Sequence, residues 1–227
     1  MQENSRWRVF DSSAEVAEAA YHHILSAASQ AIAEHGSFKL VLAGGSTPEK
    51  VYRLLAQSDA DWARWQIYYG DERCLPAEHA DRNSVMANTT LLQQTTIPAS
   101  QVFTMPTEQG SEAAAAAYRT IVANALPFDM VLLGMGEDGH TASLFPGHQH
   151  DLDELVHAVY NSPKPPPERI SLSAKALSTS SHVLFLITGA GKQAKVAEWQ
   201  AGIDLPVAHI NPSNGVDIFI DQDAFSA

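Results

Sequence analysis

The sequence predicts an α/β protein with a mostly parallel sheet flanked by helices, folded as a single domain over residues 1–227. Two observations predict this class. Short apolar runs rich in β-branched and aromatic residues alternate along the chain with longer Ala-rich or amphipathic segments. In addition, 227 residues with 45% hydrophobic content are enough for one sizeable core, and we see no internal repeat or change of composition that marks a second domain.

The expected elements follow from this alternation. Strands are predicted at residues 38–44, 65–71, 128–134, 169–173, 182–189 and 216–221, where the runs are apolar. Helices are predicted at residues 13–34, 48–55, 84–94, 112–126 and 192–199. The alanines at 113–117 favour a helix, because alanine has the highest helix propensity and Tyr118, Ile121 and Val122 continue a face that can pack. The Pro-rich stretch 162–168 is predicted to be a stiff surface loop.

Charge and cysteine content exclude several classes of function. The formal net charge is −12, which repels nucleic-acid phosphates and anionic membranes, so we expect neither as a partner. Cys74 is the only cysteine, which excludes an intrachain disulfide and a cysteine-based metal site. The first residues are polar and no apolar run reaches the length of a membrane span. We therefore expect a soluble cytoplasmic protein, and the sequence assigns no oligomeric state.

The loop after residues 128–134 matches the dinucleotide pattern G-x-G-x-x-G at Gly134, Gly136 and Gly139. That pattern binds NAD only when its last glycine opens a long helix, and Pro146–Gly147 follows too soon for one. Glu137 and Asp138 would also place two carboxylates against a pyrophosphate. We therefore exclude NAD.

A glycine turn follows residues 38–44 and precedes a predicted helix. Gly44, Gly45, Ser46 and Thr47 offer close backbone approach, hydroxyl groups and free N–H groups, with Thr47 as the helix cap and Pro48 as the first helical residue. Such a helix start is suited to a phosphate. The equally acceptable alternative is a tight turn with an ordinary cap.

Two other strand ends carry charge, and ligands of open parallel sheets bind beyond the carboxyl ends of strands. Asp71, Glu72 and Arg73 follow one strand, and Lys192 follows another at the start of a helix. Arginine and lysine are the usual phosphate ligands, so Arg73 and Lys192 are candidates, with Arg169 a weaker one. Taken singly, each is more often a solvated surface charge.

His140 is the candidate general base. An unperturbed histidine has a pKa of about 6.5, suited to proton transfer at neutral pH, and Asp138 is placed to fix its tautomer. The alternative is a histidine that merely closes the turn. A metal site is a weaker interpretation, because His148 and His150 form one H-x-H without a third spaced ligand, so we expect no catalytic metal.

Taken together and in order, five segments resemble the 6-phosphogluconolactonases: residues 40–48, 68–76 with 82–84, 129–148, 169–173 and 186–192. The resemblance implies a Rossmann-like α/β domain that hydrolyses 6-phospho-D-glucono-1,5-lactone in the pentose phosphate pathway. It implies that His140 activates water, and that the glycine turn with Ser46, Thr47 and Arg73 holds the phosphate, joined by Lys192 and Arg169. Lactone hydrolysis needs no cofactor. Asp71 is left to orient either a sugar hydroxyl or the water.

Two alternatives remain. The related glucosamine-6-phosphate isomerases/deaminases have a similar loop, but with a glutamate that takes part in ring opening where this chain has Phe145. A non-catalytic sugar-phosphate sensor on the same fold would usually carry a DNA-binding module, for which this chain has neither spare length nor a basic segment.

Overall fold

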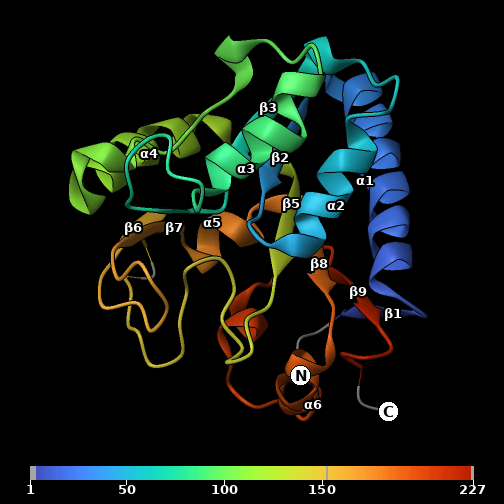
Figure 1. The fold of residues 1–227 in the computed structure, drawn as a ribbon, viewed down its shortest axis with the longest axis vertical. Helices are drawn as coiled ribbons and strands as arrows, with labels where there is room; N and C mark the ends of the chain where they lie inside the picture. The colour runs from blue at the N-terminus through green and yellow to red at the C-terminus, as the bar shows by residue number, and fades with distance from the viewer. Residues whose placement is uncertain (1–3, 152, 226–227) are drawn as a thin grey trace.

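The computed structural model describes residues 4–151 and 153–225 and is built around a six-stranded parallel sheet (Figure 1). Its order is β1-β9-β8-β5-β2-β3, and every pairing in it is parallel. The strands are β1 Arg6–Phe10, β2 Phe38–Leu42, β3 Trp65–Tyr69, β5 Phe128–Gly134, β8 Ser180–Ile187 and β9 Val216–Asp221. The central strands are apolar along their length because both faces of the sheet are covered. The predicted α/β class is confirmed.

Helices cover both faces of this sheet. The helices of the described residues are α1 Ser13–His35, α2 Ser46–Leu55, α3 Asn83–Thr90, α4 Ser111–Ala125, α5 Ala174–Ser178 and α6 Gln193–Gln200. α1 packs beside α2 along one flank and contacts β9, β5 and β8 (Figure 1). Side chains alternate between the two faces along β8, and Phe185 points to the face away from α1. Trp199 of α6 packs on that face, with its ring centroid 5.2 Å from that of Phe185. Short 3₁₀ segments lie at Trp62–Arg64, Leu92–Gln94, Ala99–Gln101, Thr107–Gln109, Ala190–Lys192 and Pro206–His209.

A second, smaller sheet lies beside the first and was not expected as a separate unit. It is antiparallel, in the order β4-β7-β6, with β4 Asp71–Arg73, β7 Arg169–Leu172 and β6 Val156–Val159. The predicted strand at residues 169–173 therefore belongs to this sheet. β1, β4 and β6 are missing from the sequence prediction: β1 alternates arginine with apolar residues at a sheet edge, and the other two are short.

Three helix predictions need correction. α2 begins at Ser46 with Gly45 as its N-cap at φ 113°, so Thr47 lies inside the helix and is not its cap. Glycine tolerates this positive φ, which a threonine would not. The predicted helix at residues 84–94 divides into α3 and the 3₁₀ segment Leu92–Gln94, and Lys192 ends a 3₁₀ segment ahead of α6 instead of opening the helix.

No helix within the described part of the chain is both long and apolar enough to span a membrane. The predicted domain bounds, residues 1 and 227, lie outside the described residues.

Candidate active site

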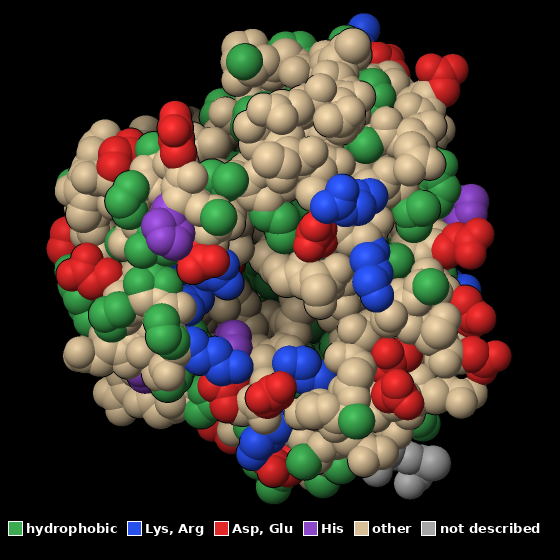
Figure 2. Space-filling view, in the orientation of Figure 1, with side chains coloured by type: hydrophobic (Ala, Val, Ile, Leu, Met, Phe, Trp, Pro, Cys, Tyr) green, Lys and Arg blue, Asp and Glu red, His purple; other side chains and the backbone are tan. Residues whose placement is uncertain are grey.

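The charged strand ends predicted from the sequence meet at one cavity. The turns after β2, β3, β5 and β8 surround a cavity of about 330 Å³ at the carboxyl edge of the main sheet. Its lining includes Gly44, Gly45, Asp71, Arg73, Asn83, His140, Lys164, Arg169 and Lys192. Figure 2 shows this hollow with several Lys and Arg side chains around it. On a protein of net charge −12, such a cationic hollow suits an anionic ligand.

The loop after β5 places His140 in this cavity. The Gly136 N–H donates to the His140 carbonyl at 2.8 Å, and the Gly139 N–H donates to the Gly136 carbonyl at 3.0 Å. Gly139 has a φ of 84°, which favours glycine. A side chain on Gly136 would collide with the His140 imidazole. Gly136 and Gly139, two of the three glycines that match the dinucleotide pattern, therefore allow a tight loop to fold around His140.

His140 and Asp138 form a close pair. Asp138 Oδ1 lies 2.5 Å from His140 Nδ1. The His140 side chain is only 16% exposed. Burial lowers the pKa of His140, and the positive charge of Lys164 adds to this, while the Asp138 carboxylate opposes it. The imidazole is therefore neutral at neutral pH. Its Nδ1–H donates a hydrogen bond to Asp138, which leaves a free lone pair on Nε2.

Asp71 is buried in the wall of the cavity. Its Oδ2 accepts a hydrogen bond from the Ser143 hydroxyl at 2.6 Å, and its Oδ1 accepts one from the Asn83 amide at 3.0 Å. Burial raises the pKa of Asp71, whereas the Ser143 hydrogen bond and the charge of Arg169 oppose that rise. These contacts fix the carboxyl group in one orientation.

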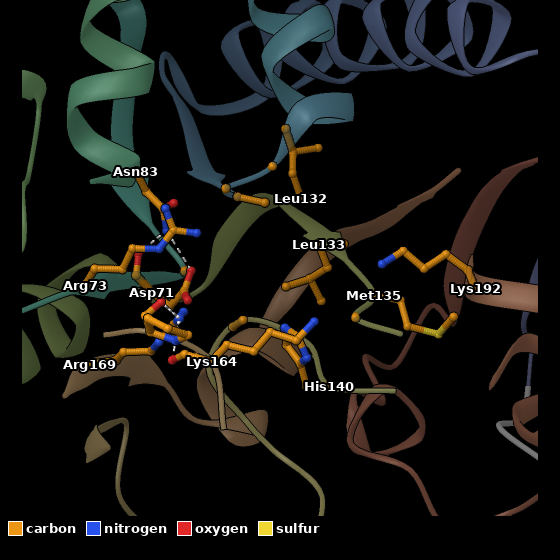
Figure 3. Close-up of a pocket in the computed structure, with 18 residues that line it drawn as sticks. Asp71, Arg73, Asn83, Leu132, Leu133, Met135, His140, Lys164, Arg169 and Lys192 are labelled. Atoms are coloured by element: carbon orange, nitrogen blue, oxygen red, sulfur yellow. Dashed lines mark hydrogen bonds between the residues drawn. The ribbon is translucent and has the colours of Figure 1, made fainter. Parts of the chain in front are cut away.

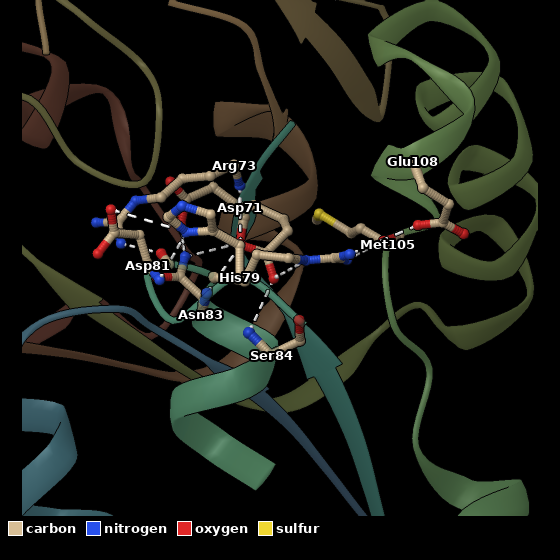
Figure 4. Close-up of polar contacts among 10 residues, drawn as sticks. Asp71, Arg73, His79, Asp81, Asn83, Ser84, Met105 and Glu108 are labelled. Atoms are coloured by element: carbon tan, nitrogen blue, oxygen red, sulfur yellow. Dashed lines mark hydrogen bonds and ion pairs between the residues drawn. The ribbon is translucent and has the colours of Figure 1, made fainter. Parts of the chain in front are cut away.

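Glu72 binds the start of α3, which carries Asn83. Its carboxylate accepts hydrogen bonds from the backbone N–H groups of Asn83 and Ser84, each at 2.8 Å, at the start of α3 (Figure 4). Arg82, itself almost wholly buried, lies 3.5 Å from the same carboxylate. Glu72 thereby caps α3 and sets the position of Asn83 against Asp71.

Arg73 and Lys192 enter the cavity from opposite sides (Figure 3). The Arg73 guanidinium donates to the Asp81 carbonyl, while its Nε is buried with no hydrogen-bond partner among the described residues. Lys192 follows a turn that the Asp221 carboxylate fixes by accepting from the Gly189 N–H at 2.9 Å. Burial lowers the pKa of Lys192, and Glu137 opposes this.

Lys164 is a further cation in the cavity and comes from the Pro-rich loop. Its ammonium group points toward His140 (Figure 3). Arg169 anchors this loop: its guanidinium donates to the carbonyls of Lys164 at 3.1 Å, Pro165 at 2.8 Å and Pro166 at 3.2 Å. Arg169 also lines the cavity, but much of its donor capacity is used on the loop.

The glycine turn presents backbone to the cavity. Gly44 and Gly45 line it, and Tyr52 fixes the preceding residue, accepting from the Ala43 N–H at 2.9 Å and donating to the Ala43 carbonyl at 2.8 Å. The predicted hydroxyls lie elsewhere: Ser46 is exposed outside the lining, and the Thr47 hydroxyl is 2.7 Å from that of Thr188. Backbone N–H groups are therefore what the start of α2 offers a ligand.

Sequence reasoning missed Lys164, Asn83 and Ser143. Lys164 lay within a stretch interpreted as a surface loop, although a lone lysine among prolines is a signal of a rigidly held cation. Asn83 and Ser143 lie inside segments that carry the family resemblance, 82–84 and 129–148, but each looks like an ordinary polar residue until the fold brings it to Asp71.

Phe145 packs against the His140 ring. Its ring centroid is 4.7 Å from that of His140, and only 2% of the residue is exposed. The Arg169 guanidinium carbon lies 5.7 Å from the same ring. Phe145 therefore packs between the histidine and the arginine that anchors the Lys164 loop.

Comparisons with known proteins identify the family of this chain. Residues 11–219 match the model of the family described as glucosamine-6-phosphate isomerases/6-phosphogluconolactonase. The chain is 35% identical to a human 6-phosphogluconolactonase over 95% of this chain and 91% of that one. It is likewise 35% identical to a probable chloroplastic 6-phosphogluconolactonase 3 of Oryza sativa subsp. indica, over 96% and 74% of the two chains.

A solved structure gives the same result for the fold. The crystal structure of 6-phosphogluconolactonase from Thermotoga maritima superposes with a TM-score of 0.90 at 29% identity, covering 96% of this chain and all of that one (100%). The match of sequence and fold extends over the strand ends that form the cavity. This chain belongs to the glucosamine-6-phosphate isomerase/6-phosphogluconolactonase family.

Proposed function

We propose that the protein hydrolyses 6-phospho-D-glucono-1,5-lactone to 6-phosphogluconate. The observation that carries this proposal is an aspartate-paired histidine in the same cavity as four cationic side chains, those of Arg73, Lys164, Arg169 and Lys192. A δ-lactone is an activated ester, so its hydrolysis needs a base for water, a stabilised oxyanion and a grip on the remote phosphate. The relatives named above carry this activity in their names, and the chain covers most of their length.

His140 is the proposed general base. Its Nε2 takes a proton from water as the water oxygen bonds to the lactone carbonyl carbon, which gives a tetrahedral oxyanion. As the oxyanion collapses, the bond to the ring oxygen breaks and the protonated His140 returns its proton to that oxygen. The products are the open-chain hydroxyl and the carboxylic acid, which then ionises. Asp138 keeps the imidazole oriented and stabilises its protonated form.

Lys164 is the proposed stabiliser of the oxyanion. Its ammonium group is directed toward His140, so it faces the region where the attacked carbonyl would lie (Figure 3). A fixed positive charge in a partly buried cavity stabilises negative charge that develops only in the transition state. The Arg169 contacts hold the loop that carries it.

The phosphate is assigned to Arg73, Lys192 and the glycine turn. Arg73 brings a buried Nε without a hydrogen-bond partner among the described residues, and the start of α2 brings backbone N–H groups at Gly45 and beyond. Asp71, whose oxygens accept from Ser143 and Asn83, is assigned to a sugar hydroxyl. These contacts would fix the lactone ring relative to His140.

Phe145 argues against the isomerase alternative. A phenyl ring cannot transfer a proton, and here it packs against His140 at the position where the related isomerases carry a glutamate. The sensor alternative does not account for the aspartate-paired histidine. The acidic composition supports the further proposal of no nucleic-acid partner, and the single cysteine supports that of a reducing compartment such as the cytoplasm.

The deciding experiment follows loss of the phosphorylated lactone by NMR, against its spontaneous hydrolysis in the same buffer. Isomerase activity on glucosamine 6-phosphate is measured in parallel. We expect hydrolysis well above the spontaneous rate and no isomerisation. Hydrolysis at the spontaneous rate by folded protein would overturn the proposal, and isomerisation would favour the rival enzyme.

A further inference from the structure

Three metal-ligating side chains meet far from the candidate active site. His23 lies on α1, His182 is near the start of β8, and Asp217 is near the start of β9. The cavity is at the carboxyl ends of the parallel strands, so this group lies toward the opposite, amino-terminal edge of the sheet. None of the three residues lines that cavity.

The fold directs the three side chains to a common point. Asp217 pairs with Leu184, two residues after His182, so both side chains leave the sheet on the same face. α1 covers that face, and His23 lies at the rim of its buried stripe, between Ala20 and Ala27. The rings of His23 and His182 are 5.9 Å apart and perpendicular.

The distances leave a gap among the ligand atoms. One nitrogen from each histidine and one Asp217 oxygen all lie within 4.8 Å of one another. His23 Nε2 is 3.8 Å from Asp217 Oδ2, too far for a hydrogen bond. The same Nε2 is buried and has no hydrogen-bond partner among the described residues. Buried polar atoms without a hydrogen-bond partner are uncommon in folded proteins, and such an atom is a position where an ion or a water can bind.

Arg6 fixes the orientation of the Asp217 carboxylate. Its Nε donates to Asp217 Oδ1 at 2.8 Å and its Nη2 donates to Oδ2 at 2.9 Å. Each carboxylate oxygen has another lone pair, so Oδ2 can bond to an ion while it accepts from Arg6.

We propose that His23, His182 and Asp217 bind one divalent transition-metal ion, with Zn²⁺ the best match, and that the ion ties α1 to β8 and β9. Two imidazoles and one carboxylate suit zinc and not Mg²⁺ or Ca²⁺, which prefer oxygen ligands. Zinc bonds of about 2.0–2.1 Å place ligands roughly 3.3 Å apart, so the ligand atoms would move together by up to about 1.5 Å. Water completes the coordination. The role is structural, with no part in lactone hydrolysis.

The test uses Zn²⁺ as the probe and the whole chain, freed of metal by a chelator and dialysis. Calorimetric titration is expected to show one tight site per chain. A His23→Ala, His182→Ala double variant is expected to lose at least ~100-fold in affinity. The matched control is His22→Ala, which removes an exposed histidine from the neighbouring position of the same helix and should bind as the parent does. A His148→Ala, His150→Ala variant controls for the other histidine pair.

Further measurements separate loss of the site from loss of the fold, and report the coordination of the ion and its effect on stability. His23→Gln keeps a polar side chain of similar size, and its circular dichroism is compared with that of the parent before titration. Co²⁺ replaces Zn²⁺ in the parent, where strong visible absorption indicates tetrahedral coordination. Near-saturating Zn²⁺, at about 100 times its Kd, is expected to raise the parent Tm by roughly 5–10 °C and leave the double variant unchanged. Tight binding that survives in the double variant, or loss only in the His148→Ala, His150→Ala variant, would overturn the proposal.

Discussion

Arg169 donates a hydrogen bond to the backbone carbonyl of Lys164 at 3.1 Å, across a loop that also offers it the carbonyls of Pro165 and Pro166. Prolines have no N–H, so the segment has few donors of its own. Ser162 donates its N–H to the Pro167 carbonyl at 3.0 Å and its hydroxyl to the Lys164 carbonyl at 2.8 Å, and the Arg169 guanidinium supplies further donors. We therefore propose that Arg169, which the sequence presents as a phosphate ligand, has a positioning role that acts through Lys164.

We predict that Arg169→Lys lowers kcat/KM about tenfold, because a lysine ammonium cannot span the three carbonyls that the planar guanidinium reaches. Lys164→Ala should cost ~10²-fold or more, as expected for loss of an oxyanion contact. The double variant should lose little beyond Lys164→Ala alone. The measurement is a double-mutant cycle on kcat/KM.

Lys175→Ala is the matched control for loss of one lysine, because Lys175 is exposed and 3.5 Å from Asp153 outside the cavity. It should be close to the parent in activity. Strictly additive losses from Arg169→Lys and Lys164→Ala would contradict the positioning role and restore Arg169 as an independent phosphate ligand.

His140→Ala is predicted to lower kcat at least ~10²-fold with little change in KM, because the lost group acts in proton transfer and not in binding. In the parent, activity needs the neutral imidazole, so the rate falls as the pH drops through the pKa of His140. Burial lowers that pKa, and the acid limb of kcat/KM should lie below the ordinary histidine value of about 6.5. A pH–rate profile checks both statements. Near-normal turnover in folded His140→Ala protein would remove His140 from its role.

Arg73→Ala is predicted to weaken use of the phosphorylated lactone mainly through a higher KM, since a phosphate contact is present in the ground state and the transition state alike. The comparison substrate is the unphosphorylated lactone, which has no group for Arg73 to hold. Its kcat/KM should change much less. Equal losses on the two lactones would show that Arg73 is not a phosphate ligand.

The sequence predicted the parts of this protein that depend on local pattern. The bounds of β5 and β9 were predicted without error, because both are buried runs that end at chemistry-bearing loops. His140 was placed in the cavity because the loop that carries it folds on its own glycines. Lys164 was missed because the position of its loop depends on the Arg169 side chain at the start of β7, and no local pattern shows that contact. The group at His23 was missed because three distant segments supply it, and no local spacing marks such a site.

Exhaustive chelation is predicted to leave lactone hydrolysis unchanged at moderate temperature, because the proposed mechanism uses His140, Lys164 and water without an ion. Initial rates are compared before and after dialysis against a chelator. If the zinc site at the far edge of the sheet is occupied, the same treatment should lower Tm while the rate stays constant. Loss of rate that added Zn²⁺ restores would place a metal in the reaction.

Phe145→Glu is predicted to reduce hydrolysis and to move the acid limb of the pH–rate profile upward. The new carboxylate would lie against His140, whose ring centroid is now 4.7 Å from that of Phe145, and would favour the protonated imidazole. It would also oppose the developing oxyanion and draw Arg169 away from the Lys164 loop, since the guanidinium carbon is 5.7 Å from this ring.

The matched control is Phe145→Leu, which loses ring contact but adds no charge, so its acid limb should stay where the parent's lies. We expect no isomerase activity from Phe145→Glu, because one carboxylate does not supply the rest of a ring-opening site. The measurement is kcat/KM against pH for the three proteins, with folding checked first, because a charge at a position only 2% exposed also costs stability. An acid limb that moves equally in the leucine and glutamate variants would mean that packing, and not charge, sets the His140 pKa from this side.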